Sequence, residues 1–190
     1  MKEIVILGGP NGAGKTTAAR VLLPKFIHVH RFLNADEIAR TLLPENLEAS
    51  DLAAGRRMIE RMRDLLLQGS SFGLETTCSG KSYVSILRQC KEDGWRITLL
   101  FLWLKSPEDA VARVARRVRE GGHNVPSEVI RRRYFAGLSN LLDLYLPLAD
   151  EAEIYDNSNK RRILIAERRE GGILLIHDSR RWARIRKAAQ

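Results

Sequence analysis

Short apolar runs alternate along the chain with longer segments in which apolar residues recur at helical spacing. Residues 3–8 and 95–104 are dominated by apolar side chains, which predicts strands that are buried on both faces of a sheet. Residues 26–33 alternate between apolar and polar positions, as a half-buried strand does. Two shorter strands are expected at 71–77 and 153–155.

Helical spacing fills the intervals between these strands. Six helices are expected, over residues 15–23, 35–42, 51–68, 82–93, 106–120 and 127–146. Ser106 is followed by a proline and, three residues on, by an acid, which is the pattern of a capped helix start. We expect Ser127 to cap the next helix and Pro147 to end it.

The end of the chain departs from this alternation. Residues 162–166 and 173–176 flank Gly171-Gly172 and predict a β-hairpin, and a short basic helix is expected at 179–188. Strands that alternate with helices predict an α/β fold with a mainly parallel, five-stranded sheet covered on both faces. The hairpin would be an addition at one edge. No linker rich in Pro, Gly or Ser divides the chain, so residues 1–190 are expected to form one domain.

A phosphate-binding motif stands between the first expected strand and the first expected helix. Gly9 to Thr16 fills the P-loop (Walker A) pattern G-x-x-x-x-G-K-[ST] without a gap. Its glycines let backbone N–H groups surround a phosphate, and the helix N-terminus favours an anion. Lys15 would reach the β- and γ-phosphates of ATP, and the Thr16 hydroxyl would bind Mg²⁺. The expected ATP-binding residues are Gly9, Pro10, Asn11, Gly12, Ala13, Gly14, Lys15, Thr16 and Thr17. The alternative is a glycine-rich turn that binds nothing.

The charge of the chain is positive and unevenly distributed. The net charge is +9, and residues 160–190 alone hold 10 basic and 3 acidic side chains. Residues 105–135 add 8 basic and 4 acidic ones. Such an excess suits anionic ligands such as nucleotides, nucleotide-sugars or nucleic acid. For the C-terminal segment, a solvated basic surface explains the charge equally well.

The sequence also predicts a compartment. The longest apolar run, Leu99 to Leu104, is too short to cross a bilayer, and residues 1–25 hold no signal peptide. We therefore expect a cytoplasmic protein without a membrane partner. Cys78 and Cys90 are expected to be free thiols in that compartment, and no Cys/His spacing indicates zinc.

Acidic residues follow two of the expected strands, where ligands bind in open α/β sheets. Asp36 comes after the strand at 26–33 and is the candidate base for a substrate hydroxyl, although it could merely cap the following helix. Glu75 ends the strand at 71–77 and could bind the acceptor or a water on Mg²⁺, or only a nearby turn. Thr76 and Thr77 place two hydroxyls beside it and are weaker candidates for acceptor contacts.

Arginines precede a glycine-rich loop in the second half of the chain. Arg113 and Arg117 lie four residues apart on one expected helix face, and Gly121-Gly122 follows. This layout is typical of a mobile lid, here about residues 113–133, that brings arginines over phosphates. The alternative is a solvated basic helix. His123 could contact a phosphate when the lid closes, or it could be an ordinary loop residue.

Several of these motifs together resemble the zeta toxin family of P-loop kinases, and in particular its short branch, whose members are often described as ABC-type ATPases. The resemblance covers about residues 3–160. Besides the P-loop it is carried by Asn34-Ala-Asp36, Glu75-Thr-Thr77, Arg113 to Arg117, Gly121 to Pro126, Arg133-Tyr134 and Asp156-Asn-Ser158.

The resemblance implies a three-layer P-loop kinase fold with a helical lid and ATP-dependent phosphorylation of a hydroxyl. In the toxins the acceptor is a UDP-N-acetyl amino sugar, and an antitoxin protein is a possible partner. By motif position, Lys15 would be the P-loop lysine, Asp36 the base, Glu75 a substrate contact and Arg113 a lid arginine. The toxins carry a second arginine before the lid proline. Here that place reads Gly-Gly-His123, so Arg117 or His123 would have to substitute.

Two other classes of protein remain as alternatives. The string Gly9 to Thr16 also occurs in transporter ATPases, but this chain lacks the L-S-G-G-Q sequence and the strand ending in Asp-Glu that such engines need. A nucleic-acid-associated NTPase or kinase would use the basic surface. No basic, aromatic-rich motif for single strands is visible to support it.

Overall fold

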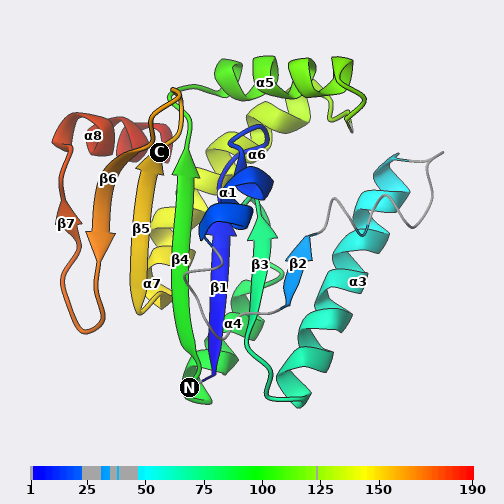
Figure 1. Cartoon of the computed structure of the whole chain (residues 1–190), viewed down its shortest axis with the longest axis vertical. Coiled ribbons are helices and arrows are strands. Elements are labelled where there is room, and N and C mark those ends of the chain that lie inside the picture. Colours follow the sequence, from blue (N-terminus) through cyan, green and yellow to red (C-terminus); the bar gives the residue numbers. More distant parts are fainter. Residues whose placement is uncertain (1, 23–30, 35–37, 39–46, 123) are drawn as a thin grey trace.

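A computed structural model of the chain describes residues 2–22, 31–34, 38, 47–122 and 124–190. Seven strands form one sheet in the order β2-β3-β1-β4-β5-β6-β7 (Figure 1). Neighbours from β2 to β5 run parallel, whereas β6 and β7 pair antiparallel. The strands are β1 (Glu3–Gly8), β2 (Phe32–Asn34), β3 (Phe72–Thr76), β4 (Arg96–Trp103), β5 (Glu151–Asp156), β6 (Ile163–Arg168) and β7 (Leu175–Ile176).

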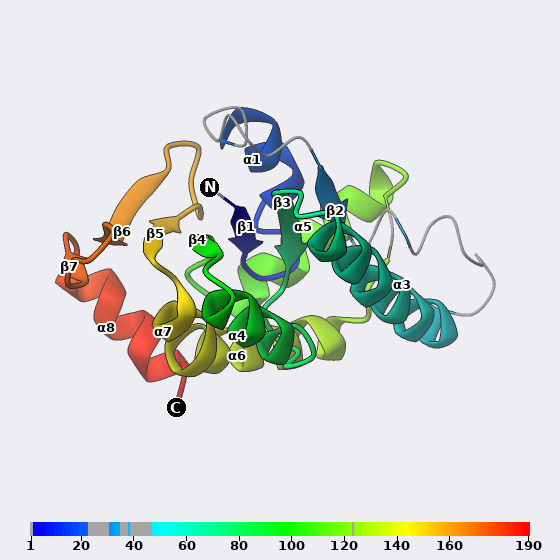
Figure 2. The ribbon, with the colours of Figure 1, turned by 90° about the horizontal axis from the view of Figure 1, so that it is seen from below.

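Helices cover both faces of the sheet, so the fold has the three layers that the sequence predicts. Seen from below, α1 lies on one face, while α4, α6, α7 and α8 lie on the other (Figure 2). Helix α3 packs beside β2 at the edge of the sheet, and α5 crosses above the carboxyl ends of the strands (Figure 1). The α-helices are α1 (Lys15–Leu22), α3 (Leu47–Leu67), α4 (Val84–Glu92), α5 (Pro107–Arg119), α6 (Ser127–Asn140), α7 (Leu146–Leu148) and α8 (Ser179–Ala188).

The two central strands make up the densest part of the core. Residues 4–7 of β1 and 97–103 of β4 are almost entirely buried, apolar but for Thr98, as expected for parallel strands with helices on both sides. The P-loop follows β1 directly, and β1 pairs with β3 on one side and β4 on the other. From β1 the chain leads to β3 and β2 on one side and to β4 and β5 on the other, so the strand order changes direction at β1. In open α/β sheets, ligands bind in the crevice at the carboxyl ends of the strands at such a point.

The hairpin prediction is confirmed, and the hairpin enlarges the sheet. β6 pairs with β5 and β7 pairs with β6, so two antiparallel strands extend the five expected strands to seven. The basic helix at the end of the chain is also confirmed. It begins after Asp178, whose side chain accepts a hydrogen bond from the backbone N–H of Arg181 at 2.9 Å.

Of two predictions about helix ends, one is wrong and one is confirmed to within two residues. Ser127 is the first residue of α6 and not its cap, because Pro126 occupies that position without a side-chain hydrogen bond. The same helix continues through the π-helical turn η2 (Leu141–Tyr145) into α7 and ends at Leu148, one residue after Pro147. Proline lacks an N–H and does not continue a helix, which agrees with an end at this place.

Two other predictions fall wholly or partly outside the described residues. Of the strand expected at 26–33, the structure describes a short strand at residues 32–34. Of the helix expected at 35–42, it describes Ile38, which is buried.

The cap at Ser106 is confirmed, since the hydroxyl of Ser106 accepts a hydrogen bond from the backbone N–H of Asp109 at 3.1 Å.

Candidate active site

The P-loop depends on glycine where its backbone turns against the sheet. Gly9 has a φ of 143°, and a Cβ placed there would lie 2.4 Å from the carbonyl oxygen of Leu102 in β4. Gly12 and Gly14 also have positive φ values. Backbone conformations of this kind are open to glycine and strained for other residues, so the motif's glycines are required by its geometry.

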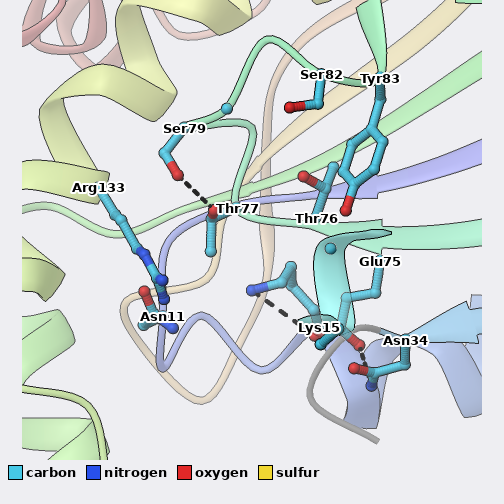
Figure 3. A pocket seen from close by; sticks show the side chains of 13 residues that line it. Asn11, Lys15, Asn34, Glu75, Thr76, Thr77, Ser79, Ser82, Tyr83 and Arg133 are labelled. Carbon is cyan, nitrogen blue, oxygen red and sulfur yellow. Dashed lines mark hydrogen bonds and ion pairs between the residues drawn. The ribbon is translucent and has the colours of Figure 1, made fainter. Parts of the chain in front are cut away.

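Lys15 and Glu75 form the centre of the site. Both are largely buried, with 7% and 9% of their surfaces exposed, and Lys15 Nζ lies 3.7 Å from Glu75 Oε1. Lys15 Nζ also donates to the carbonyl oxygen of Pro10 at 3.1 Å. The other oxygen of Glu75, Oε2, accepts from the Thr16 hydroxyl at 3.0 Å and from the Asn34 amide at 3.1 Å. The start of α1 and the end of β2 thus direct side chains to the carboxylate at the end of β3, and Figure 3 shows Lys15, Asn34 and Glu75 of this group.

Two cavities meet at this centre, and Asn11, Lys15 and Glu75 line both of them. The larger, of about 490 Å³, lies between the P-loop and α5. Its other lining residues are Gly12, Gly14, Thr16, Thr17, Arg113, Arg116, Arg117 and Glu120. This cavity joins backbone amides, Lys15 and arginine side chains, which is the chemistry that binds phosphate groups.

The smaller cavity, of about 200 Å³, lies on the other side of Lys15 and is lined by hydroxyl groups. Arg133 of α6 extends into it towards Asn11, opposite Glu75 (Figure 3). Its hydroxyl-bearing residues are Thr76, Thr77, Ser79, Ser82 and Tyr83. A small polar molecule with its own hydroxyl groups would find many hydrogen-bond partners here.

The loop that carries these hydroxyls is held from behind by α6 and η2. Asn140 donates to the carbonyl oxygens of Cys78 and Ser79 at 2.9 and 3.1 Å, and the Tyr145 hydroxyl donates to that of Gly80 at 3.1 Å. Gly137 lets α6 approach closely, because a Cβ there would lie 2.6 Å from the carbonyl oxygen of Thr77. Burial raises the pKa of the Cys78 thiol to about 12, despite the opposing effect of Lys15.

The arginines of α5 differ in their surroundings. Arg113 donates to the carbonyl oxygen of Ser158 at 2.6 Å and lies 3.5 Å from that of Gly12, so it lies directly above the P-loop. Arg117 is half-buried and lines the same cavity. Arg116 is exposed and pairs with Glu120 at 3.0 Å.

The model of the zeta toxin family matches residues 1–169 of the chain. The chain belongs to the zeta toxin family. An uncharacterized protein of Haemophilus influenzae is 31% identical to it over 128 residues, which are 66% of this chain and 88% of that protein.

Solved structures with low sequence identity share the fold of this zeta toxin family protein. AvrRxo1-ORF1:ORF2, crystallised with ATP, has a TM-score of 0.75 at 17% identity over 97% of this chain and 63% of that longer chain. The PezAT toxin–antitoxin system of Streptococcus pneumoniae has a TM-score of 0.63 at 19% identity, over 88% and 72% of the two chains. Shikimate kinase of Bacteroides thetaiotaomicron has a TM-score of 0.50 at 16% identity, over 84% and 89%. The fold predicted from sequence, that of a P-loop kinase, is confirmed.

Most of the candidate residues of this zeta toxin family protein gather where the sequence places them. Glu75, Thr76, Thr77, Arg113 and Arg117 line the two joined cavities, as do six of the nine expected ATP-binding residues: Asn11, Gly12, Gly14, Lys15, Thr16 and Thr17. Gly9, Pro10 and Ala13 are not in the lining of either cavity. Asp36 and His123 lie outside the described residues. Several residues that contribute to the site are not among the expected site residues, and they include Asn34, Asn157 and Arg133. Asn34 and Asn157 lie at the carboxyl ends of β2 and β5, so the rule that led to Glu75 could have found them.

Proposed function

We propose that this protein is a kinase that transfers the γ-phosphate of ATP to a hydroxyl group of a small-molecule acceptor. The pair of cavities that meet at Lys15 is the observation that carries the proposal. One cavity suits a nucleotide's phosphates, and the other supplies room and hydrogen bonds for an acceptor. An ATPase needs only a water molecule beside the γ-phosphate, so a second, hydroxyl-lined cavity favours a kinase over that alternative.

In this proposal, the P-loop and the arginines act on the phosphates. Residues 9–17 bind ATP, Lys15 holds the β- and γ-phosphates, and Arg113 and Arg117 stabilise charge that develops during transfer. The Thr16 hydroxyl and the Glu75 carboxylate, 3.0 Å apart, are hard oxygen ligands of the kind that Mg²⁺ uses together with phosphate oxygens. Bound Mg²⁺ would neutralise phosphate charge there.

The acceptor would bind on the other side of Lys15. Thr76 and Thr77 offer hydroxyls there, and Glu75 lies where this cavity meets the cavity proposed for the phosphates. Asp36 is proposed as the base that takes the proton of the acceptor hydroxyl, on the strength of its place two residues after Asn34. His123 remains a candidate acceptor or phosphate contact. A UDP-N-acetyl amino sugar, the acceptor of the toxins, is the first compound to test.

Incubation with γ-labelled ATP, Mg²⁺ and a panel of nucleotide-sugars, nucleosides and NAD tests the proposal. Mass spectrometry should detect an acceptor that gains one phosphate, and transfer should far exceed ATP hydrolysis. Lys15→Ala should abolish transfer, and Asp36→Asn should lower it by ~10²–10⁴-fold while ATP still binds. Hydrolysis of ATP without transfer to any acceptor would favour the ATPase alternative. Unchanged transfer by Asp36→Asn would refute its role as base.

A protein partner is proposed as well, because AvrRxo1-ORF1 was crystallised with ORF2 and PezAT is a toxin–antitoxin system. If the kinase activity is toxic, induced expression of the wild-type protein should slow bacterial growth and Lys15→Ala should not. Equal growth of both cultures would contradict toxicity. Among the helices that the structure describes, none combines the length and the apolar composition of a membrane span.

A further inference from the structure

Helix α8 brings an arginine to the loop that follows β5. This helix lies at the carboxyl end of the sheet, near the end of β5 (Figure 1). Arg181 Nε donates to Asp156 Oδ2 at 2.7 Å, and the guanidinium group also pairs with Asp178 at the start of the helix. The family match ends at residue 169, so this contact joins a segment outside the match to one inside it.

Asp156 needs a cationic partner because it is buried. Only 5% of its surface is exposed, and a buried carboxylate is costly unless it is paired. Burial works against its charge, but hydrogen bonds from Ser158 and Arg181 outweigh this effect and hold the pKa of Asp156 below its usual value. The pair with Arg181 therefore stabilises Asp156 in its charged form.

The charged Asp156 in turn determines the shape of the loop 156–158. Its Oδ1 accepts from the backbone N–H of Ser158 at 2.8 Å, which closes a tight turn. Within that turn, the Asn157 amide donates to the carbonyl oxygen of Ala13 in the P-loop at 2.7 Å. The carbonyl oxygen of Ser158 accepts from Arg113 at 2.6 Å. The turn thus supports both the P-loop and the arginine above it.

We propose that Arg181 is a positioning residue for the nucleotide site, acting through Asp156 on the loop 156–158. It fixes the turn from which Asn157 supports the P-loop and Ser158 holds Arg113. The inference rests on the proposed binding of ATP by the P-loop. A purely structural role, in which Arg181 only attaches α8 to the sheet, would change the free energy of unfolding but not the affinity of the folded protein for a nucleotide.

Calorimetric titration with Mg²⁺ and a non-hydrolysable ATP analogue separates these two roles, at a temperature where thermal melts show every variant folded. Arg181→Ala should weaken binding about tenfold, in the range of coupling carried through a hydrogen-bonded network. Arg181→Lys, which keeps the charge, should recover much of the loss. Arg180→Ala is the matched control, since Arg180 is an exposed arginine on the same helix, and it should bind within about twofold of wild type.

Asn157→Ala keeps the test decisive if Arg181→Ala fails to fold. It removes the contact with Ala13 and leaves the pair between Arg181 and Asp156 in place, so it should also weaken binding about tenfold. Wild-type affinity in a folded Arg181→Ala or in Asn157→Ala would overturn the inference. An equal loss of nucleotide affinity in Arg180→Ala would also overturn the inference. The cause would then be the positive charge of α8 in general and not the contact between Arg181 and Asp156. If the wild-type protein binds no nucleotide, the proposed function itself fails.

Discussion

Replacing Gly9 by alanine tests whether the P-loop geometry demands glycine. The added Cβ would lie 2.4 Å from the Leu102 carbonyl oxygen, about 1 Å closer than ordinary contact. The oxygen is a backbone atom of β4 and the Cβ is fixed to the backbone of the P-loop, so neither can rotate away. Overpacking of this kind costs ~1–3 kcal/mol, and a φ of 143° adds ~1–3 kcal/mol for a residue with a side chain. We therefore expect Gly9→Ala to lower the free energy of unfolding by about 2–6 kcal/mol.

Gly55 provides the matched control for this substitution. It lies inside α3, its φ is not in the positive region, and a Cβ there meets no atom within 4 Å. Alanine favours a helix over glycine, so Gly55→Ala should raise the free energy of unfolding by ~0.5–1 kcal/mol.

Urea titrations followed by circular dichroism measure both changes, and calorimetry with a nucleotide measures binding. Gly9→Ala should also weaken nucleotide binding, because relief of the clash with Leu102 must move the P-loop. Equal stability of Gly9→Ala and wild type, with unchanged nucleotide affinity, would refute the argument from close packing. It would mean that the loop can adopt another conformation without cost.

Three further expectations concern residues around the same site. Arg113→Ala should lower kinase turnover by ~10³-fold with a much smaller change in ATP affinity. If only the affinity for ATP changes, Arg113 contributes to the binding of ATP and not to the stabilisation of the transition state. Burial raises the pKa of Cys78 to about 12, so the unfolded chain loses this thiol proton at a lower pH than the folded chain. Stability therefore falls as pH rises above 9.0, and Cys78→Ala should flatten that fall in urea titrations. Tyr145→Phe removes the hydrogen bond to Gly80 and should cost ~1 kcal/mol of unfolding free energy.

The features that the sequence predicts best depend on residues that are neighbours in the chain. The P-loop motif has a fixed local conformation, and the short, continuous apolar run of β4 favours a strand buried on both faces. The sequence predicts the cap at Ser106 because its partner, Asp109, lies three residues away. It predicts Glu75 as a site residue because the carboxyl ends of parallel strands meet at one edge of the sheet.

Contacts between distant parts of the chain could not be read in this way. Arg133 lies in a motif of the family resemblance and in the expected lid, but its sequence neighbours do not indicate that it lines the hydroxyl-rich cavity, because the position of α6 in the fold places it there. The same holds for Arg181, whose partner Asp156 lies 25 residues earlier and on another element. Ser127 shows the converse problem, because its local preference for a helix cap is not realised and Pro126 takes the cap position instead.

The hydrogen bond between Asn157 and Ala13 has a consequence for the order in which the protein is completed during synthesis. These residues are 144 positions apart, so the ribosome makes the P-loop long before its supporting amide exists. Translation adds ~5–20 residues per second, which leaves the loop without this contact for roughly 7–30 seconds. A nascent chain that ends before residue 157 contains the whole phosphate-binding motif but not the turn whose amide donates a hydrogen bond to it. Nucleotide-binding competence should therefore arise late in translation, although its sequence motif is among the first parts of the chain to be made.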